Sequence, residues 1–142
     1  MRRLWLPGLP VLAVIAACDD SPATPKVPAD TVAPRVFALS PAPLARNVSR
    51  DATIMVTFTE PINPATVGVG SFLVRLGFDT VPGTYAFGDS TASFIPASRL
   101  QILGTYSVLL TRGIRDPAGN QLAADTAWSF QTASSIPAPP RR

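Results

Sequence analysis

The sequence has no histidine, one lysine and one cysteine among 142 residues. Histidine is the commonest general base near neutral pH, and histidine and cysteine are the usual ligands of zinc and copper. Lys26 lies in a proline-rich stretch, so a Schiff-base mechanism has no residue to use elsewhere in the chain. Glu60 is the only glutamate, and a catalytic carboxylate pair would require it or two aspartates brought together by folding. We therefore expect no enzyme, no catalytic residue and no cofactor.

Clustered positive charge is also missing. The formal net charge is +3, and Arg2 and Arg3 contribute to it although they lie in a segment that we expect to be removed. A nucleic-acid groove needs several neighbouring cations to displace counterions. The arginines of the central part are instead far apart in sequence: Arg46, Arg50, Arg75, Arg99, Arg112 and Arg115. The sequence argues against nucleic acid as a partner.

The chain begins with the features of an export signal. Arg2 and Arg3 precede an apolar stretch over residues 4–17, which is shorter than the roughly 20 residues that a membrane-spanning helix needs. Acidic residues and a proline-rich stretch follow at once. Residues 1–17 are therefore predicted to be a signal peptide.

The residues at the end of this segment, Ile15-Ala16-Ala17-Cys18, resemble the lipobox of bacterial lipoproteins. The resemblance implies cleavage before Cys18, a diacylglycerol on its thiol, and lipid anchoring on the exported side of a membrane of the bacterial cell envelope. The identity of that membrane, inner or outer, is left open. Two alternatives also stay open: an ordinary secretory signal cut after Ala17, which leaves a free thiol, and a buried structural cysteine.

Prolines dominate both flanks of the central segment. Residues 18–33 join the lipidated cysteine to the domain and carry Pro22, Pro25 and Pro28 without an apolar face, which predicts an extended linker. At about 3.1 Å per residue such a linker reaches up to about 45 Å from the lipid surface. Residues 133–142 are predicted to be a disordered tail.

Residues 34–132 have the length and the pattern of an all-β domain. Ile54, Val56 and Phe58 alternate with more polar neighbours, as expected of a strand with one buried face. The same alternation places Tyr106, Val108 and Leu110, and then Trp128 and Phe130, in the core. Strands are predicted over residues 35–40, 53–58, 71–76, 83–87, 91–95, 105–111 and 128–131, and one helical turn over 63–67. The inward face of 35–40 cannot be assigned, because Val36 and Ala38 compete with Phe37 and Leu39.

The same segment resembles the SbsA-type bacterial Ig-like domain. The residues that carry the resemblance are Asn47-Val48-Ser49-Arg50-Asp51, Glu60-Pro61-Ile62-Asn63-Pro64, Gly104-Thr105-Tyr106, Asp116-Pro117-Ala118-Gly119-Asn120 and Trp128-Ser129-Phe130-Gln131-Thr132. The resemblance implies an immunoglobulin-like antiparallel β-sandwich of about seven strands.

The expected function is that of a membrane-anchored, non-catalytic interaction or spacer domain. Its partners would be membrane lipid, through acylated Cys18, and a protein or glycan at the envelope. The alternative is a carbohydrate-binding or adhesin module, which would need exposed aromatic side chains. Asp116, Asn120 and Asp125 are close in sequence and carry oxygen ligands suited to Ca²⁺, but their spacing does not match the EF-hand loop, and capping of turns explains them better. Whether they bind calcium stays open, and we predict no metal site.

Overall fold

Two strands show most clearly how the sequence produces the fold. In β2 (Ile54–Phe58) and β7 (Thr105–Leu110) every second side chain is buried, and the residues between them are more exposed. The predicted inward residues of both strands are among the most buried in the protein. Each strand therefore presents one apolar face, and the two faces must be covered by other parts of the chain.

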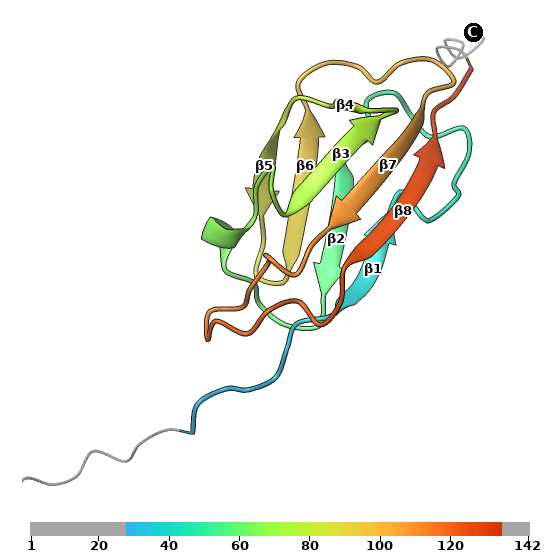
Figure 1. Ribbon diagram of the computed structural model, residues 1–142. Coiled ribbons are helices and arrows are strands. Elements are labelled where there is room, and N and C mark those ends of the chain that lie inside the picture. Colours follow the sequence, from blue (N-terminus) through green and yellow to red (C-terminus); the bar gives the residue numbers. More distant parts are fainter. Residues whose placement is uncertain (1–27, 135–142) are drawn as a thin grey trace, which may run out of the picture.

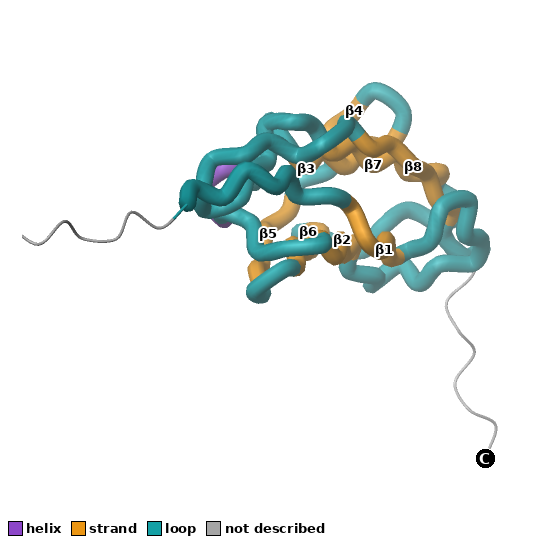
Figure 2. The backbone as a smooth tube through the Cα atoms, turned by 90° about the horizontal axis from the view of Figure 1, so that it is seen from below, coloured by secondary structure: helices purple, strands orange, loops and turns teal. Residues whose placement is uncertain are grey.

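The computed structural model describes residues 28–134. These residues form two antiparallel sheets of four strands each, in the orders β1-β2-β6-β5 and β4-β3-β7-β8 (Figure 1). Figure 2 shows the sheets as two layers seen almost end on. This arrangement confirms the predicted immunoglobulin-like all-β sandwich. The remaining elements are β1 (Val36–Ser40), the 3₁₀ turn η1 (Pro64–Thr66), β3 (Phe72–Leu76), β4 (Asp79–Thr80), β5 (Gly83–Phe87), β6 (Thr91–Pro96) and β8 (Thr126–Gln131).

Aromatic side chains fill the space between the layers. Phe72 of β3 lies with its ring centroid 5.8 Å from that of Tyr85 in β5 and 6.2 Å from that of Phe94 in β6. The hydroxyl of Tyr85 donates a 2.7 Å hydrogen bond to the carbonyl of Phe72, which ties one sheet to the other. Burial raises the pKa of this hydroxyl, so it remains a donor at neutral pH.

Strand β1 explains why its inward face could not be assigned. Its pairing with β2 shifts register between Val36 and Ala38, which is the mark of a bulge. Val36 and Leu39 are consequently the residues that pack against the core, while the Phe37 side chain is 75% exposed. A strict alternation of inward and outward side chains does not predict this face, because the bulge inserts an additional residue and shifts the alternation.

The described residues form eight strands, in agreement with the prediction of about seven, and one of them was not expected. The additional strand, β4, has two residues and pairs with the end of β3, Leu76 opposite Asp79. The loop between them is Gly77-Phe78, and Gly77 has a φ of 61°, which glycine adopts without strain. A two-residue loop that begins with glycine is a hairpin signal, and it would have indicated this strand. The predicted helical turn is confirmed as η1.

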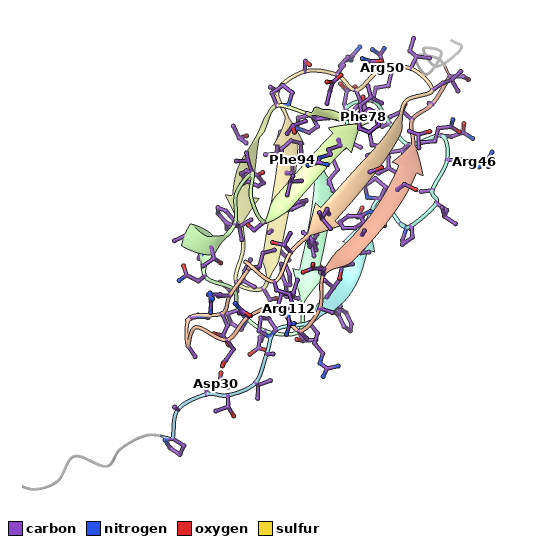
Figure 3. All side chains as sticks on the ribbon, viewed as in Figure 1. Asp30, Arg46, Arg50, Phe78, Phe94 and Arg112 are labelled. Atoms are coloured by element: carbon purple, nitrogen blue, oxygen red, sulfur yellow. The ribbon has the colours of Figure 1, made fainter. Side chains whose placement is uncertain are left out.

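The ends of the described chain lie at opposite ends of the sandwich (Figure 1). Figure 3 places Asp30 and Arg112 at one end, and Arg50 and Phe78 at the other. The N-terminal segment therefore joins the domain at one end, and the C-terminal residues leave it at the other.

Within residues 28–134, no helix has the length and apolar character needed to cross a membrane.

Phe94 and Phe78 provide a matched test of the fold. Phe94 is 2% exposed and Phe78 is 101% exposed. We expect Phe94→Ala to lower the free energy of unfolding by about 3–5 kcal/mol, because truncation leaves a cavity between the sheets. Phe78→Ala should change it by less than about 0.5 kcal/mol. Urea unfolding followed by circular dichroism measures both, and equal effects of the two substitutions would contradict the assigned core.

Candidate functional site

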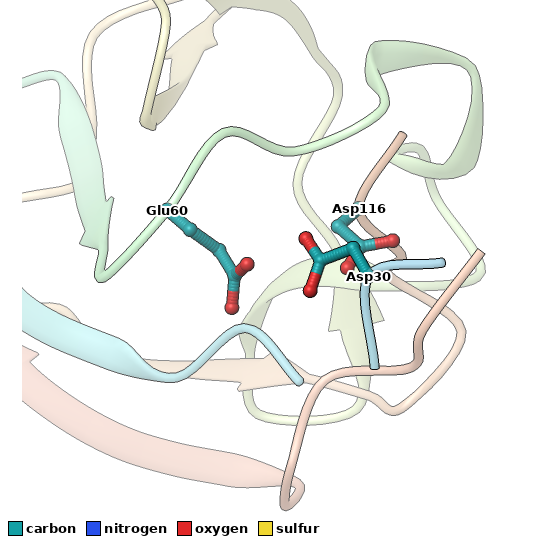
Figure 4. A group of neighbouring side chains, drawn as sticks. All are labelled: Asp30, Glu60 and Asp116. Carbon is teal, nitrogen blue, oxygen red and sulfur yellow. The ribbon is translucent and has the colours of Figure 1, made fainter. Parts of the chain in front are cut away.

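Three carboxylates meet at the end of the sandwich where the N-terminal segment enters. Asp30 precedes β1, Glu60 follows β2, and Asp116 lies in the loop between β7 and β8. One oxygen of each side chain lies within 4.8 Å of an oxygen of both others. Figure 4 shows the carboxyl groups of Glu60 and Asp30 facing each other, with Asp116 beside Asp30. We call this set the carboxylate cluster.

Asp116 is held in place by the turn that it begins. Its two carboxylate oxygens accept hydrogen bonds from Asn120, one from the backbone N–H at 2.8 Å and one from the side-chain amide at 2.7 Å. The turn closes through Gly119, which has a φ of 95°, and its N–H donates to the Asp116 carbonyl. These hydrogen bonds fix the orientation of the Asp116 side chain. The residue is also buried, with 2% of its surface exposed.

Asp30 is brought to the cluster by its backbone. The side-chain amide of Asn120 donates a 3.1 Å hydrogen bond to the Asp30 carbonyl, and one Asp30 carboxylate oxygen accepts from the N–H of Val32 at 2.9 Å. Further along, the Pro34 carbonyl accepts from Ala123. Asp30, which falls within the predicted linker, is therefore hydrogen-bonded to the loop of Asp116 although it is exposed. At the other end Ala133, predicted to be in the tail, hydrogen-bonds to Val48 and Leu103.

The environment changes the pKa of two of the three carboxyl groups in opposite directions. Burial, together with the negative charges of Asp30 and Asp116, raises the pKa of Glu60. Burial also acts to raise the pKa of Asp116, but hydrogen bonds from Asn120, Gly119 and Ala118 outweigh it and lower that pKa. One oxygen of Glu60, Oε1, is buried and has no hydrogen-bond partner. Within the described part of the chain the only ion pair joins Arg99 to Asp51, so no arginine neutralises the cluster.

The structure separates the three residues that sequence spacing had grouped. Asp116 and Asn120 lie together, whereas the Asp125 carboxylate accepts a 2.7 Å hydrogen bond from the backbone N–H of Arg112. Both arrangements cap turns, as the preferred interpretation of these residues predicts. Glu60 was named only as the single glutamate that a carboxylate pair would require, and Asp30 was not singled out. Neither was linked to Asp116, because each lies on a different segment and no local spacing connects them. The predicted lipid-attachment residue, Cys18, lies outside the described residues.

The outer face of the second sheet has an apolar groove. Strand alternation points Leu73 of β3, Leu109 of β7 and Ala127 of β8 away from the core. The loop before β2 adds Pro43 and Leu44, and the resulting groove has a volume of about 580 Å³. The loop is held there by the indole N–H of Trp128, which donates to the Pro41 carbonyl at 3.1 Å. The groove offers apolar contact rather than acid–base chemistry.

Glu60 and Asp116 give a pH test with opposite signs. The pKa of Glu60 is higher in the folded protein than in the unfolded chain. Its protonated carboxyl group therefore contributes to the stability of the fold at low pH, and this contribution is lost as the pH rises through the folded-state pKa. In EDTA at pH 7, Glu60→Gln should therefore raise the midpoint of thermal unfolding by a few degrees, and the gain should shrink as the pH falls to about 4.

Asp116→Asn removes the same charge and serves as the control. The pKa of Asp116 is lowered in the folded protein. Its carboxylate therefore stabilises the fold at pH values above the usual pKa range of an aspartate, and this contribution is lost on acidification. This variant should be less stable than the wild type at pH 7, and the deficit should diminish at acidic pH. Scanning calorimetry across this range checks both, and a destabilised Glu60→Gln at pH 7 would contradict the expected sign.

Comparisons with solved structures identify the fold. The N-terminal part of the bacterial S-layer protein SbsC matches 75% of this chain with a TM-score of 0.55 and 21% identity, and this chain spans 25% of that one. An L,D-transpeptidase from Mycobacterium smegmatis matches 72% of this chain, and 41% of its own, with a TM-score of 0.52 and 19% identity. Alpha-2-macroglobulin from Escherichia coli, domains MG0-NIE-MG1, matches 72% of this chain and 33% of its own, with a TM-score of 0.54 and 16% identity. At these identities the likeness concerns the fold alone.

Among curated proteins none matches this chain. The family profile described as the bacterial Ig-like domain matches residues 30–132, which include all eight strands and all three residues of the carboxylate cluster. This range also agrees with the observation that Asp30 lies against the domain. The chain therefore belongs to the bacterial Ig-like domain family.

Proposed function

We propose that this chain is a lipoprotein of the bacterial cell envelope, anchored through Cys18, whose non-catalytic Ig-like domain serves as an interaction or spacer module. The observation that carries the proposal is the position of Cys18. It follows a signal-like segment of residues 1–17 and precedes a proline-rich stretch that leads to one end of the sandwich. The first described residues enter the sandwich at one end, and the last described residues leave it at the other.

The domain supports the spacer role by its shape and its chemistry. The first described residues and the last ones lie at opposite ends of the layered structure, so the domain adds its own length to that of the linker (Figure 1). The transpeptidase likeness concerns the fold and brings no catalytic residue to this chain. Partners under this proposal are membrane lipid at Cys18 and a protein or glycan of the envelope.

The anchor is tested at the cysteine. Mass spectrometry of the membrane-extracted chain should show acyl groups on Cys18 as the N-terminal residue. Cys18→Ala should move the protein out of the membrane fraction, because two or three acyl chains hold a protein firmly and none remains. Ser21→Ala is the matched control and should stay with the membrane. An unmodified Cys18 in the mature protein would refute the anchor.

The alternative, a carbohydrate-binding or adhesin module, is favoured by one observation. Phe37, Phe78 and Phe87 are 75%, 101% and 42% exposed. They lie in β1, in the loop between β3 and β4, and in β5. Because these are three separate places, the side chains do not form the continuous aromatic platform on which a sugar ring would stack.

A glycan array separates the two functions. Under the spacer proposal, the wild type and Phe78→Ala should bind no glycan above the signal of an unrelated Ig-like domain. Reproducible binding of the wild type that is lost in Phe78→Ala would overturn the spacer role and establish the alternative. Leu44→Ala is a suitable control, because Leu44 is an equally accessible apolar residue at 78% exposure.

A further inference from the structure

We infer that Asp30, Glu60 and Asp116 form a Ca²⁺ site that fastens the N-terminal segment to the end of the sandwich. The three side chains come from three segments that are distant in sequence, and one oxygen of each lies within 4.8 Å of the others. Figure 4 shows the carboxyl group of Glu60 directed at that of Asp30, with Asp116 beside it.

The oxygen Oε1 of Glu60 points independently to a ligand. It is buried and accepts no hydrogen bond, whereas buried polar atoms in proteins are almost always paired. A carboxylate oxygen withdrawn from water without a partner costs stability, and a cation next to it removes that cost. A carboxylate oxygen of Asp30 and one of Asp116 lie within 4.8 Å of a Glu60 carboxylate oxygen.

The local charge balance gives the same indication. Across residues 28–134 the only ion pair is that of Arg99 with Asp51, so no arginine forms an ion pair with the cluster. Three carboxylates at this separation repel one another strongly when all are ionised. The raised pKa of Glu60 reflects that repulsion together with burial. A divalent cation would hold all three in the ionised form.

The donor set selects calcium among the common divalent cations. All three side chains offer hard oxygen ligands, and the sequence has no histidine that could favour zinc. Calcium accepts six to eight oxygens at about 2.3–2.6 Å, so that oxygens on opposite sides of the ion are about 4.6–5.2 Å apart. The oxygens of the cluster all lie within 4.8 Å of one another and therefore fit within this span. Magnesium requires a tighter octahedron and keeps more of its water.

Asn120 prepares the site by joining two of its members. Its side-chain amide donates to the Asp116 carboxylate at 2.7 Å and to the Asp30 carbonyl at 3.1 Å. Asp116 is therefore already oriented, and Asp30 is already near it. Coordination through Asp30 would add a second connection between the N-terminal segment and the loop of Asp116. Waters would complete the coordination shell.

Calcium would thus set the point at which the N-terminal segment is fastened to the domain. With the ion bound, this point would be Asp30. This consequence for the spacer rests on the proposed function, whereas the site itself consists only of residues of the domain and does not depend on the anchor.

The test measures thermal unfolding of the full chain in nonionic detergent at pH 7, first in EDTA and then in about 5 mM CaCl₂, which exceeds the Kd of about 10⁻⁴–10⁻³ M of many extracellular calcium modules. Calcium should raise the unfolding midpoint of the wild type by several degrees, because it binds the folded state alone. The same concentration of MgCl₂ should raise it less. Asp30→Asn and Glu60→Gln should abolish the increase.

Asp79→Asn is the charge-matched control, because Asp79 is exposed in β4 and does not belong to the cluster. It should keep the full increase. Asp30→Asn keeps the test valid even if changes at the more buried positions impair folding, since Asp30 is exposed and its carbonyl bond to Asn120 survives.

Two results would overturn the site. One is an unfolding midpoint of the wild type that does not respond to calcium, which would mean that the carboxyl groups share a proton only. The other is an equal calcium response in Asp30→Asn, Glu60→Gln and Asp79→Asn, which would mean weak binding elsewhere. Cys18→Ala separates the two proposals: a calcium response that persists in this variant supports the site, whether or not the variant leaves the membrane.

Discussion

The fold depends on one constraint, which is that the inward faces of two sheets must cover each other completely. β2 and β7 each bury every second residue, and neither face is stable unless the other is present. The strands therefore fix the direction of the side chains that follow them. Glu60 comes two residues after buried Phe58, so the alternation of β2 continues into the loop and turns its carboxyl group toward the end of the core.

Most of the fold could be predicted from the sequence, because strands with one buried face have a visible period. Ile54, Val56 and Phe58 are the clearest example, and all are buried as expected. β1 could not be oriented because its bulge interrupts the period. β4 was missed because two residues are too few to show alternation. These failures concern local irregularities, and they leave the two-layer architecture unchanged.

The carboxylate cluster could not be predicted, for a different reason. Asp116 was recognised through the turn chemistry of its own loop, but Asp30 was attributed to the linker and Glu60 to the end of a strand. The contact between them is set by how the ends of β2 and of the β7–β8 connection meet, which is a property of the assembled sandwich. The family profile extends to residue 30, and this extension is the signal that assigns Asp30 to the domain.

Under the proposed lipid anchor, the position of the cluster would affect how the domain can move. If the N-terminal segment were free up to Pro34, the sandwich would pivot about that residue, with only the Pro34–Ala123 hydrogen bond beside it. The contacts of Asp30 with Asn120 move the pivot toward the anchor, but one hydrogen bond near the surface opens easily. Three like charges at the same point work against it. A cation bound among these carboxylates would remove that repulsion and would therefore favour the arrangement in which Asp30 is held against the loop of Asp116.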